Sequence, residues 1–273
     1  MMVRIKKQHK IMVWGISVGL GLIVLTIGIL ISNENLRLGD FLFLAGIITL
    51  FPPAVIDILE VRWKKGIDDH LPDLFRSIVQ AQKTGMTLPN ALEEASKRDY
   101  GPLTSELKKV VHQMSWGLSF EDAIRDFGER VNTELVRSNV PLIIEASRSG
   151  GRVEKVFAPM SRFIQSTLSL QKERKAQSRP YIAIIYVAFY VFVLTIILLY
   201  NGFFRELESS PLIGMTAMTP DVAEQVFVHM SFIQAFFGGL MAGKIGEGSV
   251  MSGLKHSVIL LISGYFALKL VAW

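Results

Sequence analysis

Two kinds of hydrophobic pattern divide this chain. Long apolar stretches with almost no charge lie toward both ends, whereas residues 61–180 carry many charges, with apolar positions three and four residues apart. The first pattern is typical of helices that cross a membrane, and the second of amphipathic helices around a water-soluble core. The sequence therefore predicts an all-α membrane protein with an N-terminal membrane region over 1–60, a helical domain over 61–180 and a C-terminal membrane region over 181–273.

About five transmembrane helices are expected, because about 20 apolar residues cover the hydrocarbon core of a bilayer as a helix. The candidate spans are Ile11–Ile31, Asp40–Ile58, Tyr181–Tyr200, His229–Gly243 and Leu254–Ala272. The second is interrupted by Pro52 and Pro53. The first is too long for the core of a cleaved signal peptide, and no small-residue cleavage site follows it.

The distribution of Lys and Arg predicts how the chain is oriented. Cations precede the first span, follow the second and precede the third, whereas the loops 32–39 and 201–228 hold only Arg37 and Arg205. Lys and Arg collect on the cytoplasmic side of membrane proteins. We therefore expect a multi-pass protein of the cell membrane with its N-terminus and residues 61–180 in the cytoplasm and its C-terminus outside.

A short motif recurs within the predicted helical domain. Residues 85–92 (GMTLPNAL) and 117–124 (GLSFEDAI) share a glycine, a hydroxyl residue and an alanine at matching places, and a looser copy starts at Gly150 and Gly151. A glycine after a helix takes the left-handed conformation that ends it, so Gly85 and Gly117 are predicted turn residues.

The hydroxyl residues of the motif, Thr87 and Ser119, can accept a hydrogen bond from the free N–H groups of the next helix. Ala91 and Ala123 then allow neighbouring helices to approach closely. These features predict a bundle of about six short helices. The spacing also resembles that of open helical repeat arrays, although the Trp and Tyr positions typical of such arrays are missing.

Composition excludes several kinds of chemistry. The chain has no cysteine, which excludes disulfides, thiol catalysis and Cys-based zinc sites. Its histidines show no metal-binding spacing, and no serine lies in a nucleophile elbow. The glycines and lysine of Gly238–Lys244 resemble a phosphate-binding loop, but Ile245 replaces the required Ser or Thr and the stretch is apolar. We predict no enzyme activity and no cofactor.

The net charge and the small residues of the spans indicate contacts with lipid, with other proteins or between helices, and not catalysis. The formal net charge is +5, and its basic excess falls in residues 61–180, which favours an anionic lipid surface or an acidic protein over nucleic acid. Within the spans, Gly-x-x-x-Gly pairs are typical of close helix packing in lipid. The pairs are Gly15 with Gly19 and Gly239 with Gly243.

The repeated helix starts, together with the later Glu145-x-Ser147-x-x-Gly150-Gly151 run, resemble the type II secretion system F family over roughly residues 68–170. The resemblance implies a membrane platform of the kind found in type IV pili, archaella, tight-adherence pili and type II secretion. The C-terminal region is similar to the archaellum and TadC-like branch. Many such platforms carry two of these domains, so a single one implies a homodimer or a paralogous partner subunit.

The resemblance also implies partners. A hexameric cytoplasmic ATPase would drive the insertion of pilin subunits, and a basic surface would bind that ATPase. The candidate contacts are Lys64, Lys65, Lys108, Lys109, Arg125, Arg130, Arg148 and Arg152. The alternative is a small transporter or channel with a regulatory cytoplasmic helical domain; against it, the spans carry few charges and show no inverted repeat.

Overall fold

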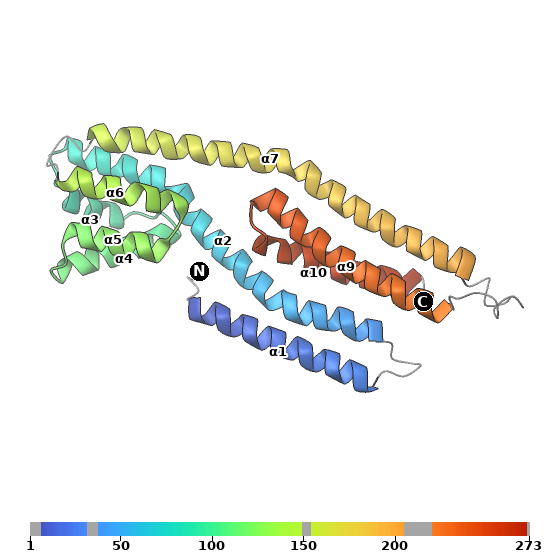
Figure 1. The fold of residues 1–273 in the computed structure, drawn as a ribbon. Helices are drawn as coiled ribbons and strands as arrows, with labels where there is room; N and C mark the ends of the chain where they lie inside the picture. Colours follow the sequence, from blue (N-terminus) through green and yellow to red (C-terminus); the bar gives the residue numbers. More distant parts are fainter. Residues whose placement is uncertain (1–6, 32–37, 149–153, 205–219, 272–273) are drawn as a thin grey trace, which may run out of the picture. The chain divides into compact units, whose positions relative to one another are not determined.

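The computed structural model describes residues 7–31, 38–148, 154–204 and 220–271, and every regular element in these ranges is a helix. The fold class is therefore all-α, as predicted. The elements in chain order are α1 (Lys7–Ile31), α2 (Leu38–Lys83), α3 (Leu88–Ser96), α4 (Pro102–Ser115), α5 (Phe120–Val131), α6 (Glu134–Arg148), α7 (Glu154–Leu199), η1 (Tyr200–Phe204), α9 (Pro220–Glu247), η3 (Met251–Gly253) and α10 (Leu254–Val271) (Figure 1).

Five of the described helices are long and apolar enough to cross a membrane: α1, α2, α7, α9 and α10. This confirms the predicted number of spans and makes the chain a multi-pass membrane protein. The expected interruption at Pro52 and Pro53 was wrong, because α2 continues through both residues. Prolines are tolerated in membrane helices where neighbouring groups satisfy the backbone that they leave unbonded.

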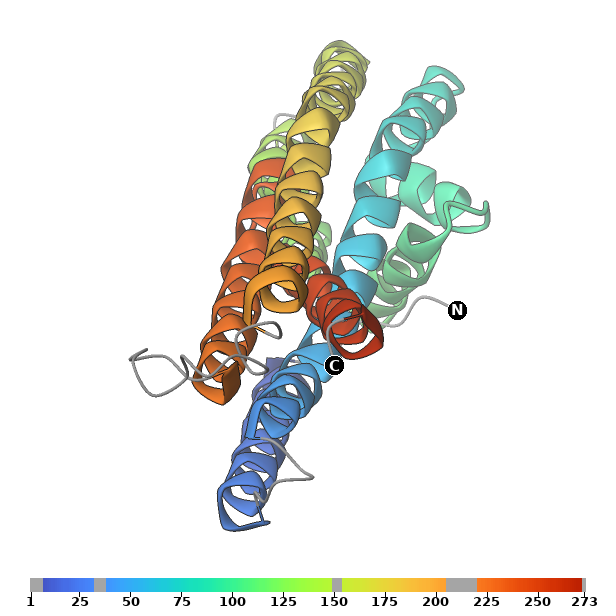
Figure 2. The ribbon, with the colours of Figure 1, turned by 90° about the vertical axis from the view of Figure 1, so that its right-hand side faces the viewer.

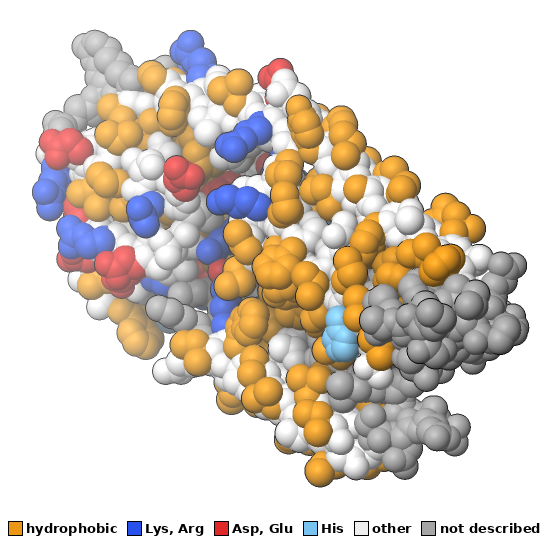
Figure 3. Space-filling model, turned by 45° about the vertical axis from the view of Figure 1, so that its right-hand side comes forward, with side chains coloured by type: hydrophobic (Ala, Val, Ile, Leu, Met, Phe, Trp, Pro, Cys, Tyr) orange, Lys and Arg blue, Asp and Glu red, His pale blue; other side chains and the backbone are white. Residues whose placement is uncertain are grey.

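The chain forms two compact units, which we describe separately. One comprises residues 59–174 and contains α3 to α6, and the other combines residues 5–58 with 175–273 and contains α1, α9 and α10. The helices α2 and α7 contribute to both units. Figure 3 shows the charged side chains gathered on one part of the visible surface and hydrophobic side chains covering most of the rest.

The unit of residues 59–174 is a bundle of six helical segments around one core. Four are the short helices α3 to α6, and the other two are parts of the long helices α2 and α7. Every segment contributes buried apolar side chains. Examples are Leu71, Phe75, Leu92, Leu103, Leu107, Ala123, Phe127, Ile143, Phe157 and Ile164.

Both copies of the repeated motif end a helix in the same way. Gly85 and Gly117 have φ angles of 87° and 92°, in the left-handed region that only glycine adopts easily. In each copy the glycine N–H donates to the carbonyl three residues back, and the following N–H donates to the carbonyl five residues back. This pair of bonds is a Schellman motif, so the predicted glycine turns are confirmed.

The helix starts of the two copies differ in their capping. The N–H of Asp122 donates to Ser119 Oγ over 3.1 Å at the start of α5. Thr87 precedes α3 without a side-chain cap bond, and Pro89 stands in the first turn, so the predicted hydroxyl cap is found only at Ser119. Ala91 and Ala123 are fully buried.

The membrane unit packs α9 closely against η3 and α10 (Figures 1 and 2). A Cβ added at Gly239 would lie 2.1 Å from the nitrogen of Ser257, and one at Gly243 would lie 2.1 Å from Cα of Gly253. Gly15 and Gly19 differ, because a Cβ there would meet no atom within 4 Å. Gly239 and Gly243 thus lie in a helix contact within this chain, whereas Gly15 and Gly19 make no such close contact with the part of the chain that the structure describes.

Polar contacts also join the helices of this unit. Lys269 Nζ donates to Asp40 Oδ2 over 2.9 Å, which links the start of α2 to the end of α10. Ser252 Oγ donates to Asp57 Oδ2 over 3.1 Å, which links α2 to η3. Both acidic side chains of the second span are therefore hydrogen-bonded within the unit.

Candidate functional site

A buried carboxylate distinguishes the second copy of the repeat from the first. Leu74 and Glu106 each lie 11 residues before the turn glycine of their copy, and their exposed fractions are 3% and 1%. The leucine shows that an apolar side chain fits this position of the fold. Burial of a carboxylate costs free energy unless cations and hydrogen bonds compensate for it. Packing alone therefore does not explain why a buried carboxylate stands at position 106, between α4 and α5.

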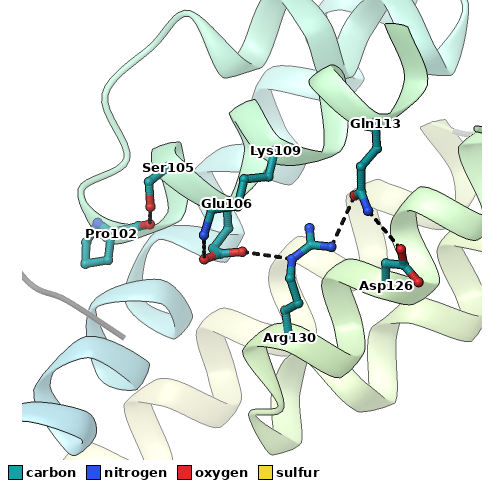
Figure 4. Close-up of polar contacts among 7 residues, drawn as sticks. All are labelled: Pro102, Ser105, Glu106, Lys109, Gln113, Asp126 and Arg130. Atoms are coloured by element: carbon teal, nitrogen blue, oxygen red, sulfur yellow. Dashed lines mark hydrogen bonds and ion pairs between the residues drawn. The ribbon is translucent and has the colours of Figure 1, made fainter. Parts of the chain in front are cut away.

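Two cations compensate Glu106, as Figure 4 shows. Lys109 Nζ donates to Glu106 Oε1 over 2.6 Å, and Arg130 Nε donates to Glu106 Oε2 over 3.2 Å. Arg130 Nη1 also donates to Gln113 Oε1 over 3.1 Å, and Gln113 Nε2 donates to Asp126 Oδ2 over 2.8 Å. These bonds form a continuous polar network between α4 and α5.

One donor of this network has no acceptor. Arg130 Nη2 is buried and makes no hydrogen bond to any residue that the structure describes. In Figure 4 this nitrogen points between Lys109 and Gln113. A guanidinium has five N–H donors in a fixed plane, and a buried donor without an acceptor costs about 1–3 kcal/mol. Arg130 therefore keeps one unused donor within the polar network.

A cavity of about 560 Å³ lies at this network, lined by Lys108, Lys109, His112, Gln113 and Arg130. Lys108 is exposed and makes no ion pair within the described residues. The cavity thus offers positive charge that Glu106 does not neutralise. We refer to these five lining residues as the α4–α5 pocket.

An exposed tryptophan follows the α4–α5 pocket along α4. Trp116 is 82% exposed and lies against His112, with 4.9 Å between the ring centroids. Large exposed aromatic side chains are frequent at the centres of protein interfaces. Trp116 therefore places an apolar surface beside the pocket, next to His112.

The first copy of the repeat has no comparable site. Arg76, Ser77 and Arg98 stand 32 residues before Lys108, Lys109 and Arg130. Arg76 pairs with Asp73, and Arg98 Nη1 donates to Ser77 Oγ over 3.2 Å. Both are exposed contacts, so the buried network is a property of α4–α5 alone.

The structure separates the eight cations that the sequence suggested as one surface. Lys108, Lys109 and Arg130 meet at the α4–α5 pocket. Elsewhere, Lys64 Nζ lies 2.9 Å from Glu60, and Arg125 Nη1 lies 2.9 Å from Asp122. The remaining three are Lys65 and Arg148, both exposed, and Arg152, which lies outside the described residues.

Sequence reasoning did not single out Glu106, His112, Gln113 or Trp116. A comparison of the two copies would have revealed Glu106, because it stands opposite Leu74 in an otherwise apolar pattern. The others carried no signal in the sequence.

The third motif joins two helices of the same bundle. Ser147 Oγ in α6 donates to Glu121 Oε1 in the first turn of α5 over 2.7 Å. This hydrogen bond holds the pKa of the Glu121 carboxyl below its usual value. Glu145 is exposed, and Gly150 and Gly151 lie outside the described residues. Within the described part of the chain, no group of three or more His, Asp or Glu side chains is placed to hold a metal ion.

Comparison with known proteins finds similarities over parts of the chain. Residues 74–200 match the sequence profile of the type II secretion system (T2SS), protein F. An uncharacterized protein of Methanocaldococcus jannaschii is 26% identical over 235 residues, which cover 84% of this chain and 38% of that relative. The chain thus spans less than half the length of this relative. No solved structure matches.

Proposed function

We propose that this multi-pass membrane protein is the platform of a type IV pilus-like machine. The match of residues 74–200 to the type II secretion system protein F family, which supplies membrane platforms of secretion and pilus machines, supports this role. In this role the chain couples a cytoplasmic hexameric ATPase to the insertion of pilin subunits. The machine is a pilus, an archaellum or a secretion system. The platform itself does no chemistry, and the ATPase is a separate chain.

The continuity of α2 and α7 carries this proposal. Each helix has 46 residues, which corresponds to about 70 Å at 1.5 Å per residue. The hydrocarbon core of a bilayer is only about 30 Å thick. Each helix is apolar over one part and contributes to the core of the bundle with another, so a movement of the bundle is passed to the membrane without an intervening loop.

The proposed orientation follows from the cations near the spans. We place the N-terminus and residues 61–180 in the cytoplasm and the C-terminus outside. Single cysteines can report this directly, because the chain has none of its own. In intact cells, a membrane-impermeant maleimide should leave Lys97→Cys unlabelled and should label it after the cells are opened. Labelling of Lys97→Cys in intact cells would refute the orientation.

The proposed platform contains at least two F-type domains. Since this chain supplies one, the second comes from another copy of the chain or from a paralogous subunit. Among the described residues, no atom lies within 4 Å of a Cβ added at Gly15 or Gly19 of α1, which leaves this face available for such a contact in the bilayer.

The deciding experiment is purification of the full chain in detergent together with the secretion ATPase and the pilin of the same organism. Recovery of both partners with the chain is expected. Solute flux through liposomes that contain the chain alone, with neither partner bound, would support a transporter or channel instead and overturn the proposal.

A further inference from the structure

We propose that the α4–α5 pocket binds one carboxylate of an acidic segment on a partner protein, and that Trp116 packs against an apolar residue of the same segment. This inference rests on the proposed function, since it names the chemistry by which the helical bundle recognises its cytoplasmic partner.

The charge of the pocket fits a single carboxylate. Three cations, Lys108, Lys109 and Arg130, face two carboxylates, Glu106 and Asp126, within the network and its lining. One net positive charge remains. Nucleic acid presents a row of phosphates and requires several cations for useful affinity. One carboxylate matches what the pocket leaves uncompensated.

The donors of the pocket are placed for the same ligand. Arg130 uses Nε and Nη1 on Glu106 and Gln113 and leaves Nη2 without an acceptor. The two bonds hold the guanidinium plane in place, so it loses little conformational freedom when it binds a further oxygen. Lys108, whose ammonium group makes no ion pair within the described chain, is available for the second oxygen.

The exposed Trp116 favours a protein over an inorganic anion as the ligand of the pocket. An inorganic anion gains nothing from an indole ring, whereas a peptide brings an apolar side chain next to its acidic one. Tryptophan and arginine are the side chains that most often dominate binding at protein interfaces. Here Arg130 lines the pocket, and Trp116 lies beside it against His112, which is also a lining residue.

Two probes test the inference on the full chain in lipid nanodiscs. The first is the secretion ATPase of the same organism, and the second is a fluorescein-labelled peptide of alternating Glu and Leu. Lys108→Glu reverses an exposed charge and leaves the buried network intact, and Trp116→Ala removes the apolar contact. Each variant should weaken the binding of both probes about tenfold, which corresponds to about 1.4 kcal/mol.

The repeat supplies matched controls. Arg76→Glu places the same reversal at the equivalent position of the first copy, and Arg98→Gln changes the residue that corresponds to Arg130. Both controls should bind each probe within about twofold of the unmodified chain. Equal losses in the controls and in the pocket variants would show only a general charge effect and would overturn the inference.

The other outcomes distinguish failure of the pocket from failure of the proposed function. If the peptide binds through Lys108 and Trp116 while the ATPase does not bind at all, the pocket stands and the proposed ATPase coupling fails. If the ATPase binds equally to all variants, the platform stands and the pocket is not its contact. If inorganic phosphate at millimolar concentration binds and the peptide does not, the site is one for a free anion, and the inference is wrong.

Discussion

The hydroxyl of Thr133 donates a 2.6 Å hydrogen bond to the carboxylate of Asp68, which lies in the charged part of α2 beyond its apolar span. The same hydroxyl accepts from the N–H of Val136 over 3.2 Å and so caps the start of α6. One buried hydroxyl thus connects the long helix α2 to the first turn of another helix of the bundle. Burial raises the pKa of Asp68 to about 6, from an ordinary value of 3.8.

This raised pKa predicts a pH-dependent stability. The folded chain holds the Asp68 proton more tightly than the unfolded chain, so the contribution of Asp68 to stability is largest below about pH 4 and falls as the pH rises from about 4 to 6. The loss is at most about 3 kcal/mol. Asp68→Asn removes the charge but still accepts from Thr133. Amide exchange in α6 should therefore be slower in Asp68→Asn than in the unmodified chain at pH 7.5, and the difference in opening free energy should be only about one third as large at pH 4.5.

Thr133→Val is the control for this prediction. It removes the cap of α6 and the bond to Asp68, so it should speed amide exchange in α6 at both pH values, by about 1 kcal/mol of opening free energy. Faster exchange in Asp68→Asn than in the unmodified chain at pH 7.5 would show that the charged carboxylate stabilises the bundle, which is the opposite of the expected effect.

The turn glycines should tolerate added volume but not an altered backbone. A Cβ at Gly85 or Gly117 would meet no atom within 4 Å, so the cost of alanine there comes from the positive φ angle alone. We expect Gly85→Ala and Gly117→Ala each to cost about 1 kcal/mol, and Gly85→Asn to cost less, because Asn tolerates this conformation. Amide exchange of the adjoining helices measures both. Equal costs for Ala and Asn would contradict the backbone explanation.

Much of this architecture could be predicted from local patterns. Apolar length identified the five spans, and the spacing of Gly85 and Gly117 identified the turns, because both features depend on short-range physics. The passage of α2 through Pro52 and Pro53 could not be predicted in this way. It depends on groups that surround the freed backbone, and those are tertiary contacts that a single sequence does not show.

The two glycine pairs of the membrane helices should respond differently to alanine. Gly239→Ala would place a methyl group against the backbone of Ser257 in α10, and Gly243→Ala against that of Gly253 in η3, so the two should push α9 away from α10 and from η3 respectively. We expect both to lower the thermal stability of the detergent-solubilised chain by several degrees or more. Gly15→Ala and Gly19→Ala meet open space and should leave the monomer unchanged.

An effect of Gly15→Ala would have to come from assembly. Cross-linking of the chain in its own membrane distinguishes this case, since loss of dimers with unchanged thermal stability would place a second copy against α1. Reduced stability of the monomer would instead show that α1 contacts another helix of the same chain at this face.

The candidate site illustrates a different limit of sequence reasoning. Eight cations suggested one basic surface, and of the seven that the structure describes, three meet at one pocket: Lys108, Lys109 and Arg130. The other four described cations pair locally or lie elsewhere, because the helix face on which a cation lies depends on how the helices pack. Trp116 gave no signal at all, since exposure of an aromatic residue cannot be read from its neighbours in sequence.

Substitutions at Glu106, the buried position of the second repeat, test whether this carboxylate serves function or packing. Glu106→Leu copies Leu74 of the first repeat, but it leaves Arg130 without its carboxylate; the Arg130 side chain is only 21% exposed, whereas that of Lys109 is 53% exposed. We expect a loss of about 1–3 kcal/mol in the opening free energy of α4–α5, measured by amide exchange.

In the double variant Glu106→Leu/Arg130→Met, no buried charge remains, and apolar replacement of a buried ion pair is often neutral or stabilising. The double variant should therefore recover the stability of the unmodified chain while losing its affinity for acidic peptide. A double variant as unstable as Glu106→Leu would assign the cost to packing and would remove the reason to regard Glu106 as a functional residue.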